Sequence, residues 1–117
     1  ICGACTILFN NEPVRSCLML APQIDNGEIT TIEGISENSS YNDLREAFKK
    51  YHALQCGYCT PGFITTIVYL LEKKQFLKEE EIREKLSGNI CRCTGYTGIV
   101  KAVEEVFLNR FKKSKND

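Results

Sequence analysis

Seven cysteines in a chain of 117 residues restrict its fold and chemistry more than any other feature. An odd number cannot pair completely in disulfides within one chain. The spacing is also short-range, with two C-x2-C pairs, one C-x-C pair and one cysteine that stands alone. Two thiolates on one tight turn can reach the same metal centre, so this spacing predicts chelation. The cysteines are Cys2, Cys5, Cys17, Cys56, Cys59, Cys91 and Cys93.

Composition argues against two classes of partner. The chain has 15 Lys and Arg residues and 15 Asp and Glu residues, so no global field favours nucleic acid or an anionic membrane surface. No apolar run approaches the roughly 18 residues of a membrane-spanning helix. The longest run, residues 63–71, is broken by Thr65 and Thr66 and predicts a buried core helix. The mass of 13.3 kDa allows one small domain or two very small ones.

The N-terminal third of the sequence predicts β structure. Two β-prone runs flank a turn, and a third run follows the turn at residues 25–27. A hairpin of the first two runs would carry Cys17 back towards Cys2 and Cys5. Residues 34–40 are polar and predict a linker between a β part and an α part. The expected strands cover residues 6–9, 14–18 and 28–32.

Helical periodicity dominates the rest of the chain. Ser39 or Ser40 can cap the first helix and Thr60 the second, and Gly88 can end the third in a left-handed conformation. Lys78 occupies the position before the acidic start of the third helix. Since the lysine side chain cannot accept a hydrogen bond from the backbone of the helix start, we expect the third helix to lack an N-terminal side-chain cap. The expected helices cover about residues 40–51, 60–74, 79–86 and 97–111.

The later cysteines form the stronger constellation. Cys56 and Cys59 precede one helix, while Cys91 and Cys93 precede the last helix. Both loops can lie at one end of a four-helix bundle, where four thiolates would converge on one centre. The spacing alone is compatible with an iron–sulfur cluster, a structural zinc ion or a redox dithiol.

The earlier cysteines supply three thiolates. The spacing of Cys2, Cys5 and Cys17 matches the later part of the plant-type ferredoxin pattern C-x4-C-x2-C…C. In that pattern the fourth ligand lies five positions before Cys2, upstream of this sequence. The start at Ile1, without Met, also suggests that residues are missing there. An alternative is a zinc site that His52 completes.

Five motifs, in order along the chain, carry a resemblance to a known family. Together they resemble the iron–sulfur subunit of the molybdenum hydroxylases, the xanthine dehydrogenase and aldehyde oxidase family, over essentially the whole chain. The motifs are Cys-Gly-Ala-Cys-Thr (2–6), Pro-Val-Arg-Ser-Cys (13–17), Thr-Ile-Glu-Gly (31–34), Gln-Cys-Gly-Tyr-Cys-Thr-Pro-Gly (55–62) and Ser-Gly-Asn-Ile-Cys-Arg-Cys-Thr-Gly-Tyr (87–96).

The resemblance implies an α+β chain of two parts. Residues 1–38 would be the C-terminal part of a β-grasp, ferredoxin-like [2Fe-2S] domain, and residues 39–117 a four-helix [2Fe-2S] domain. The first cluster would use Cys2, Cys5 and Cys17, with its fourth ligand upstream. The second cluster would use Cys56, Cys59, Cys91 and Cys93.

The resemblance also implies a role in electron transfer within an oxidoreductase complex. A large subunit would carry a molybdopterin cofactor and a medium subunit FAD, with both clusters relaying electrons between them. Gln55 matches the family residue that hydrogen-bonds the pterin, and Cys93 matches the nearest cluster ligand. Arg92, between two ligands, would offset cluster charge.

Free thiolates and cluster assembly favour the reducing cytoplasm. Two alternatives use the same cysteines. One is a zinc-stabilised interaction module, and the other is a degenerate relic that keeps a single cluster.

Overall fold

A small antiparallel sheet forms the N-terminal part of the chain. The computed structural model describes residues 2–53, 57–74, 76–91 and 96–112. Strand β1 lies in the middle of the sheet, with β2 and β3 on either side. Thr6 of β1 pairs with Arg15 of β2, and Leu8 pairs with Thr30 of β3. The strands are β1 (Thr6–Phe9), β2 (Glu12–Arg15) and β3 (Ile29–Thr30).

The β1–β2 hairpin confirms the expected turn but not the full second strand. Asn10 and Asn11 both adopt left-handed conformations, with φ of 50° and 68°, which suits a tight two-residue hairpin turn. The second strand ends at Arg15, and Ser16–Leu18 forms a 3-10 turn instead. Both the backbone N–H of Ser16, at 3.4 Å, and its hydroxyl, at 2.8 Å, donate to the carbonyl of Cys5. These bonds hold the chain beside Cys5 at the end of the ladder.

The expected linker is largely helical, so that prediction was wrong. Helix α1 spans Ile32–Ser36 and a 3-10 turn spans Ser39–Tyr41. Ile35 of α1 packs into the core, which an irregular polar linker would not require. Neither Ser39 nor Ser40 caps the helix α2 that follows, which begins after Tyr41 without a side-chain cap. The Asn38 side chain caps the 3-10 turn instead, where it accepts from Ser40 N at 2.9 Å.

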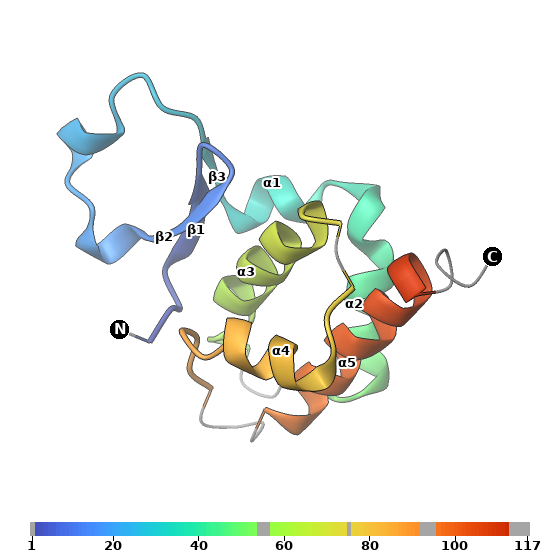
Figure 1. Cartoon of the computed structure of the whole chain (residues 1–117). Coiled ribbons are helices and arrows are strands. Elements are labelled where there is room, and N and C mark those ends of the chain that lie inside the picture. Colours follow the sequence, from blue (N-terminus) through green and yellow to red (C-terminus); the bar gives the residue numbers. More distant parts are fainter. Residues whose placement is uncertain (1, 54–56, 75, 92–95, 113–117) are drawn as a thin grey trace.

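Four further helices match the four predicted from periodicity. In Figure 1, α3 lies between the sheet and the other long helices, with α1 above it. All of its residues from Gly62 to Val68 are buried, including Thr65 and Thr66. The predicted core helix is therefore confirmed. The helices are α2 (Asn42–Lys50), α3 (Thr60–Glu72), α4 (Glu79–Lys85) and α5 (Thr97–Phe107), which continues as a π-helical turn (Leu108–Lys112).

The helix ends depart from the sequence expectations. Thr60 is the first residue of α3 rather than its cap, and Cys59 precedes it without a side-chain cap. Gly88 is not left-handed, since Gly3 and Gly57 alone have positive φ among the described glycines. Lys78 makes no side-chain cap of its own, as expected, but its backbone N–H donates to Glu81 at 3.1 Å.

The C-terminal turn is fastened to the start of α2. The Arg110 guanidinium makes two 2.7 Å bonds to the Asp43 carboxylate and also donates to the carbonyl of Ser40. It lies 5.7 Å from the centre of the Tyr41 ring. The hydrogen bonds from Arg110 hold the pKa of Asp43 below its usual value.

The Asp43→Asn variant is expected to lose about 0.5–1 kcal/mol of stability at pH 7, because the pair is half exposed. Because the pKa of Asp43 is lower in the folded state, its ionised carboxylate stabilises the fold above about pH 3.9, the pKa of an Asp in the unfolded chain. This contribution is lost as the pH falls through the folded-state pKa. The difference from wild type should therefore shrink below about pH 4. Denaturant melts from pH 7 to pH 2 measure it. Asp25→Asn is the matched control for the charge, and a pH-independent difference would contradict the prediction.

Candidate metal centre

The first cysteine group lies where the hairpin closes on the chain start. Cys2 and Cys5 precede β1, and Cys17 lies in the 3-10 turn after β2. The backbone N–H of Cys17 donates to the Cys5 sulfur at 3.4 Å. The hairpin thus brings Cys17 to Cys5, as the sequence predicted. Cys2 and Cys17 are exposed, and Cys5 is half-buried.

Hydrogen bonding prepares Cys5 as a thiolate. The backbone N–H of Cys17 is the largest cause that lowers the pKa of the Cys5 thiol to about 7, and the Cys17 and Ser16 side chains lower it further. The bond to the Cys5 side chain raises the pKa of Cys17. The two neighbouring thiols are therefore shifted in opposite directions, and Cys5 is the one favoured as a thiolate. Metal binding requires the thiolate, so this environment favours metal ligation.

The second cysteine group is buried among helices. Cys59 precedes α3 with 9% of its surface exposed, and Cys91, with 6%, lies in the loop that follows α4. The Cys91 backbone N–H donates to the Tyr96 hydroxyl at 2.9 Å. Tyr96 itself is left-handed, with φ of 71°, at the start of α5. Sequence reasoning assigned Tyr96 no role, although it closes the last motif.

Four predicted site residues cannot be placed. Gln55, Cys56, Arg92 and Cys93 lie outside the described residues. The expected convergence of all four later cysteines therefore stays a prediction. Within the described ranges, no three His, Cys, Asp or Glu side chains are grouped so that they could hold a metal ion.

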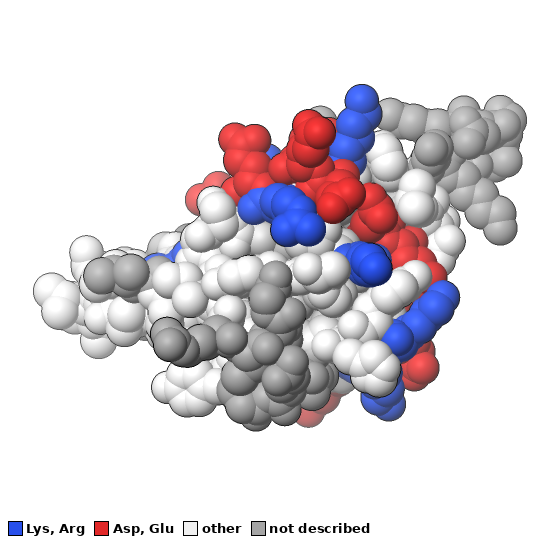
Figure 2. Space-filling model, turned by 90° about the horizontal axis from the view of Figure 1, so that it is seen from below, with Lys and Arg blue, Asp and Glu red and all other residues white. Residues whose placement is uncertain are grey.

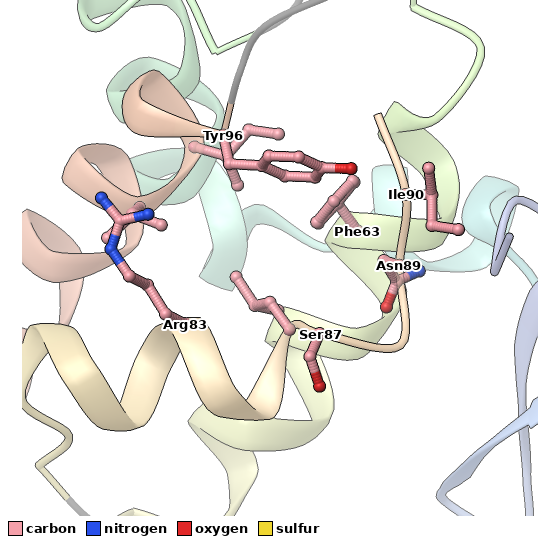
Figure 3. A pocket seen from close by; sticks show the side chains of 9 residues that line it. Phe63, Arg83, Ser87, Asn89, Ile90 and Tyr96 are labelled. Carbon is pink, nitrogen blue, oxygen red and sulfur yellow. The ribbon is translucent and has the colours of Figure 1, made fainter. Parts of the chain in front are cut away.

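A cavity of about 240 Å³ lies beside the second cysteine group. Figure 3 shows Tyr96 across this cavity from Ser87, with Phe63 next to the tyrosine ring. The ring centres of Phe63 and Tyr96 are 6.3 Å apart. Asn89 and Ile90 line the same cavity, just before Cys91. The cavity therefore shares its wall with the loop that presents Cys91.

The two cysteine groups are joined directly through the backbone. The N–H of Ile90 donates to the carbonyl of Cys2 at 2.7 Å. Cys2 belongs to the first group, and Ile90 adjoins Cys91 of the second group. This contact spans most of the sequence, so short-range spacing could not reveal it.

The donors present fit an iron–sulfur cluster. Such clusters are held by cysteine thiolates, and cysteine is the metal-binding residue type that both groups contain. The Thr60 hydroxyl adds an independent sign, because it adjoins Cys59, is buried, and has no hydrogen-bond partner among the residues that the structure describes. Buried hydroxyls are normally satisfied, so this atom suits a sulfur acceptor at the site.

Comparison with known proteins identifies the family. The family model described as "[2Fe-2S] binding domain" matches residues 31–104. The chain belongs to this family. Its relatives are iron–sulfur subunits of the xanthine dehydrogenase and aldehyde oxidase class, which confirms the resemblance drawn from the five motifs.

Individual relatives agree with the family. The chain is 48% identical over 109 residues to caffeine dehydrogenase subunit gamma of Pseudomonas sp. strain CBB1, covering 91% of this chain and 65% of that protein. It is 53% identical over 103 residues to the nicotine 6-hydroxylase small subunit of Paenarthrobacter nicotinovorans, covering 88% and 62%. The chain thus spans less than two thirds of the length of these relatives.

The fold is also shared with solved structures. Quinoline 2-oxidoreductase from Pseudomonas putida 86 matches with a TM-score of 0.84 and 44% identity, over 92% of this chain and 67% of that one. The α+β architecture of a small sheet and several helices is therefore that of [2Fe-2S]-containing oxidoreductase chains. Iron–sulfur rather than zinc is accordingly the cofactor chemistry of this family.

Proposed function

We propose that this chain is the electron-transfer subunit of a molybdenum-containing hydroxylase or dehydrogenase. It would relay electrons from a molybdopterin centre through two [2Fe-2S] clusters towards FAD. A [2Fe-2S] cluster held by the protein's cysteines would supply one-electron oxidation and reduction at its iron. The observation that carries the proposal is the bond from Ile90 N–H to the Cys2 carbonyl, because it places two cysteine-bearing loops against each other.

The site assignment follows the two cysteine groups. Cys2, Cys5 and Cys17 would hold the first cluster, together with a ligand upstream of Ile1. Gln55 would contact the pterin, as would Cys93. The second cluster would be held by Cys56, Cys59, Cys91 and Cys93.

The two clusters would belong to two parts of the chain. Residues 1–38 would be the end of a β-grasp, ferredoxin-like domain, and residues 39–117 the four-helix-bundle domain. The three-stranded sheet and the four helices α2 to α5 support this division.

The protein's residues do three things for such clusters. The Cys17 N–H and the Ser16 turn hold Cys5 ready as a thiolate. The core around α3 and α5 shields Cys59 and Cys91 from water. Burial and hydrogen bonds to sulfur set cluster potentials, so this difference in exposure would separate the potentials of the two clusters.

Exposed apolar side chains support contact with larger subunits. Leu18 follows Cys17, Tyr58 precedes Cys59, and Ile90 precedes Cys91, and all three are exposed, Tyr58 by 79%. Exposed apolar patches mark interaction sites. In the face of the molecule that Figure 2 shows, charged side chains gather along the upper and right edges, and much of the described surface to their left is uncharged.

The proposed partners are a large molybdopterin-binding subunit and a medium FAD-binding subunit, with the complex in the cytoplasm. Within the described ranges, none of the helices has the length and apolar character needed to cross a membrane.

Metal analysis of the full-length subunit, purified without oxygen, tests the proposal. We expect about four iron atoms and about four acid-labile sulfides per chain, because two [2Fe-2S] clusters contain that many. About two of each would indicate a single cluster. Zinc without sulfide would contradict the electron-transfer function.

A further inference from the structure

A buried asparagine lies between the two cysteine groups. Asn89, on the loop after α4, is only 3% exposed. Its amide nitrogen donates to the carbonyl of Gly3 at 3.1 Å, and its amide oxygen lies 3.0 Å from the Thr66 hydroxyl of α3. The side chain therefore connects the loop that carries Cys91, the loop that carries Cys2 and Cys5, and the central helix.

The donors and acceptors determine how this amide must point. The carbonyl of Gly3 can only accept, so it requires the NH₂ group of Asn89. The amide oxygen then faces the Thr66 hydroxyl, which must donate to it. The Thr66 hydroxyl also lies 3.0 Å from the Gly62 carbonyl, so its single proton has two acceptors at the same distance. A carboxylate at position 89 would instead set an oxygen against the Gly3 carbonyl.

The carbonyl of Gly3 is the centre of the contact. It also accepts from the backbone N–H of Thr6 at 3.1 Å and from the Thr6 hydroxyl at 2.6 Å. Gly3 has φ of 84°, and a Cβ there would lie 2.5 Å from the Asn89 amide nitrogen. The backbone of this loop thus approaches Asn89 more closely than any residue with a side chain would allow.

Arg15 holds the same two loops from the outside. Its guanidinium donates to the carbonyl of Gly88 at 2.6 Å and to the Thr6 hydroxyl at 3.0 Å. One residue beyond Asn89, the N–H of Ile90 donates to the Cys2 carbonyl. The hydrogen bonds on both sides of Asn89 therefore tie residues 2–6 to residues 88–90.

We propose that Asn89 is a positioning residue that sets the placement of the Cys2–Cys5 loop relative to the Cys91 loop. This rests on the proposed function, in which each loop ligates one cluster. Asn89 is placed to act because it is buried, is hydrogen-bonded through both its amide nitrogen and its amide oxygen, and is adjacent to the link between Ile90 and Cys2. Its role is to hold ligands of the two centres in a constant relation, not to ligate metal.

The Asn89→Asp variant tests the proposal in the full-length subunit within its complex. The variant keeps the volume but removes the donor to Gly3. We expect hydrogen exchange of the peptide containing Ile90 to become at least about tenfold faster, because the neighbouring bond to Cys2 opens more often. The magnetic interaction between the two reduced clusters in the low-temperature EPR spectrum should also weaken. Asn109→Asp makes the same change at an exposed site of the C-terminal turn and should alter neither readout.

A second pair of variants acts on the other end of the amide. Thr66→Val removes the hydroxyl at nearly constant volume, and Thr66→Ser keeps it. We expect Thr66→Val to accelerate the same exchange and Thr66→Ser to retain the wild-type rate. If Asn89→Asp does not fold, the comparison of Thr66→Val with Thr66→Ser still tests the positioning role of Asn89.

The outcomes separate this proposal from the proposed function. Unchanged exchange at Ile90 and an unchanged EPR interaction in both Asn89→Asp and Thr66→Val would overturn the positioning role. A wild-type subunit without two clusters would overturn the proposed function, and the exchange rates would still decide whether Asn89 holds the loops together.

Discussion

Replacing Gly62 by alanine is expected to force the Cys2–Cys5 loop away from helix α3. A Cβ on Gly62 would overlap the carbonyl oxygen of Gly3 and lie 3.1 Å from its carbonyl carbon and 3.2 Å from Cα of Ala4. All three atoms belong to backbone, so no side chain can turn aside. Overpacking of this kind costs about 1–3 kcal/mol or more. A thermal melt should show a lower Tm, and the loop displacement should accelerate hydrogen exchange in residues 2–6.

Gly34→Ala provides the matched control. Gly34 lies in helix α1, and a Cβ there would come no closer than 3.6 Å, to a methyl group of Thr30. This is ordinary van der Waals contact, and alanine favours the helix by about 0.5–1 kcal/mol. The control should therefore be neutral or slightly more stable than wild type. A Gly62→Ala protein as stable as Gly34→Ala would show that α3 and the loop are not in close contact.

The positions of the helices could be predicted from the sequence because they follow from local periodicity. Apolar residues recurred at helical spacing in three of the predicted helices, and tertiary packing buried those same faces. The helix over residues 79–86 was predicted instead from its acidic first turn and the glycine after it. The hairpin was predictable for a similar reason, since two asparagines adopt left-handed turn conformations easily. The proximity of Cys17 to Cys5 followed directly from that hairpin.

The caps and the linker could not be predicted because several residues compete for the same role. Asn38, Ser39 and Ser40 are all residue types that can cap a helix, and the structure uses Asn38 for the 3-10 turn and none of them for α2. Residues 34–40 look like a linker by composition, yet Ile35 has a core position that stabilises α1. A single buried side chain outweighed the polar residues around it.

The contact between the two cysteine loops was hidden from the sequence for a different reason. Asn89 and Gly3 are separated by 86 positions, and neither residue type indicates a partner at that range. Gly62 and Gly3 likewise belong to separate motifs. Close backbone approach has no local signature beyond the glycine itself, so it emerges only from the packed structure.

Replacing single cysteines should divide the iron content between the two groups, and this is the largest functional effect expected. Cys59→Ser, in the full-length subunit, removes a buried thiolate from the second group and should lower iron and sulfide from about four each to about two. Cys17→Ser removes an exposed thiolate from the first group and should give the same loss. The two variants should differ in which cluster signal disappears from the EPR spectrum.

Electron delivery to FAD should fail in both variants, because each variant removes a cluster that the proposed electron-transfer route requires. Substrate-dependent reduction of FAD in the assembled complex measures this, and we expect a loss of at least about a hundredfold, in line with the effect of disrupting a metal site. Asn109→Asp is the control, since it changes an exposed side chain of the C-terminal turn that belongs to neither cysteine group. If Cys59→Ser and Cys17→Ser abolished the same EPR signal, the cysteines would form one centre rather than two. The bond between Ile90 and Cys2 would then join two halves of a single site.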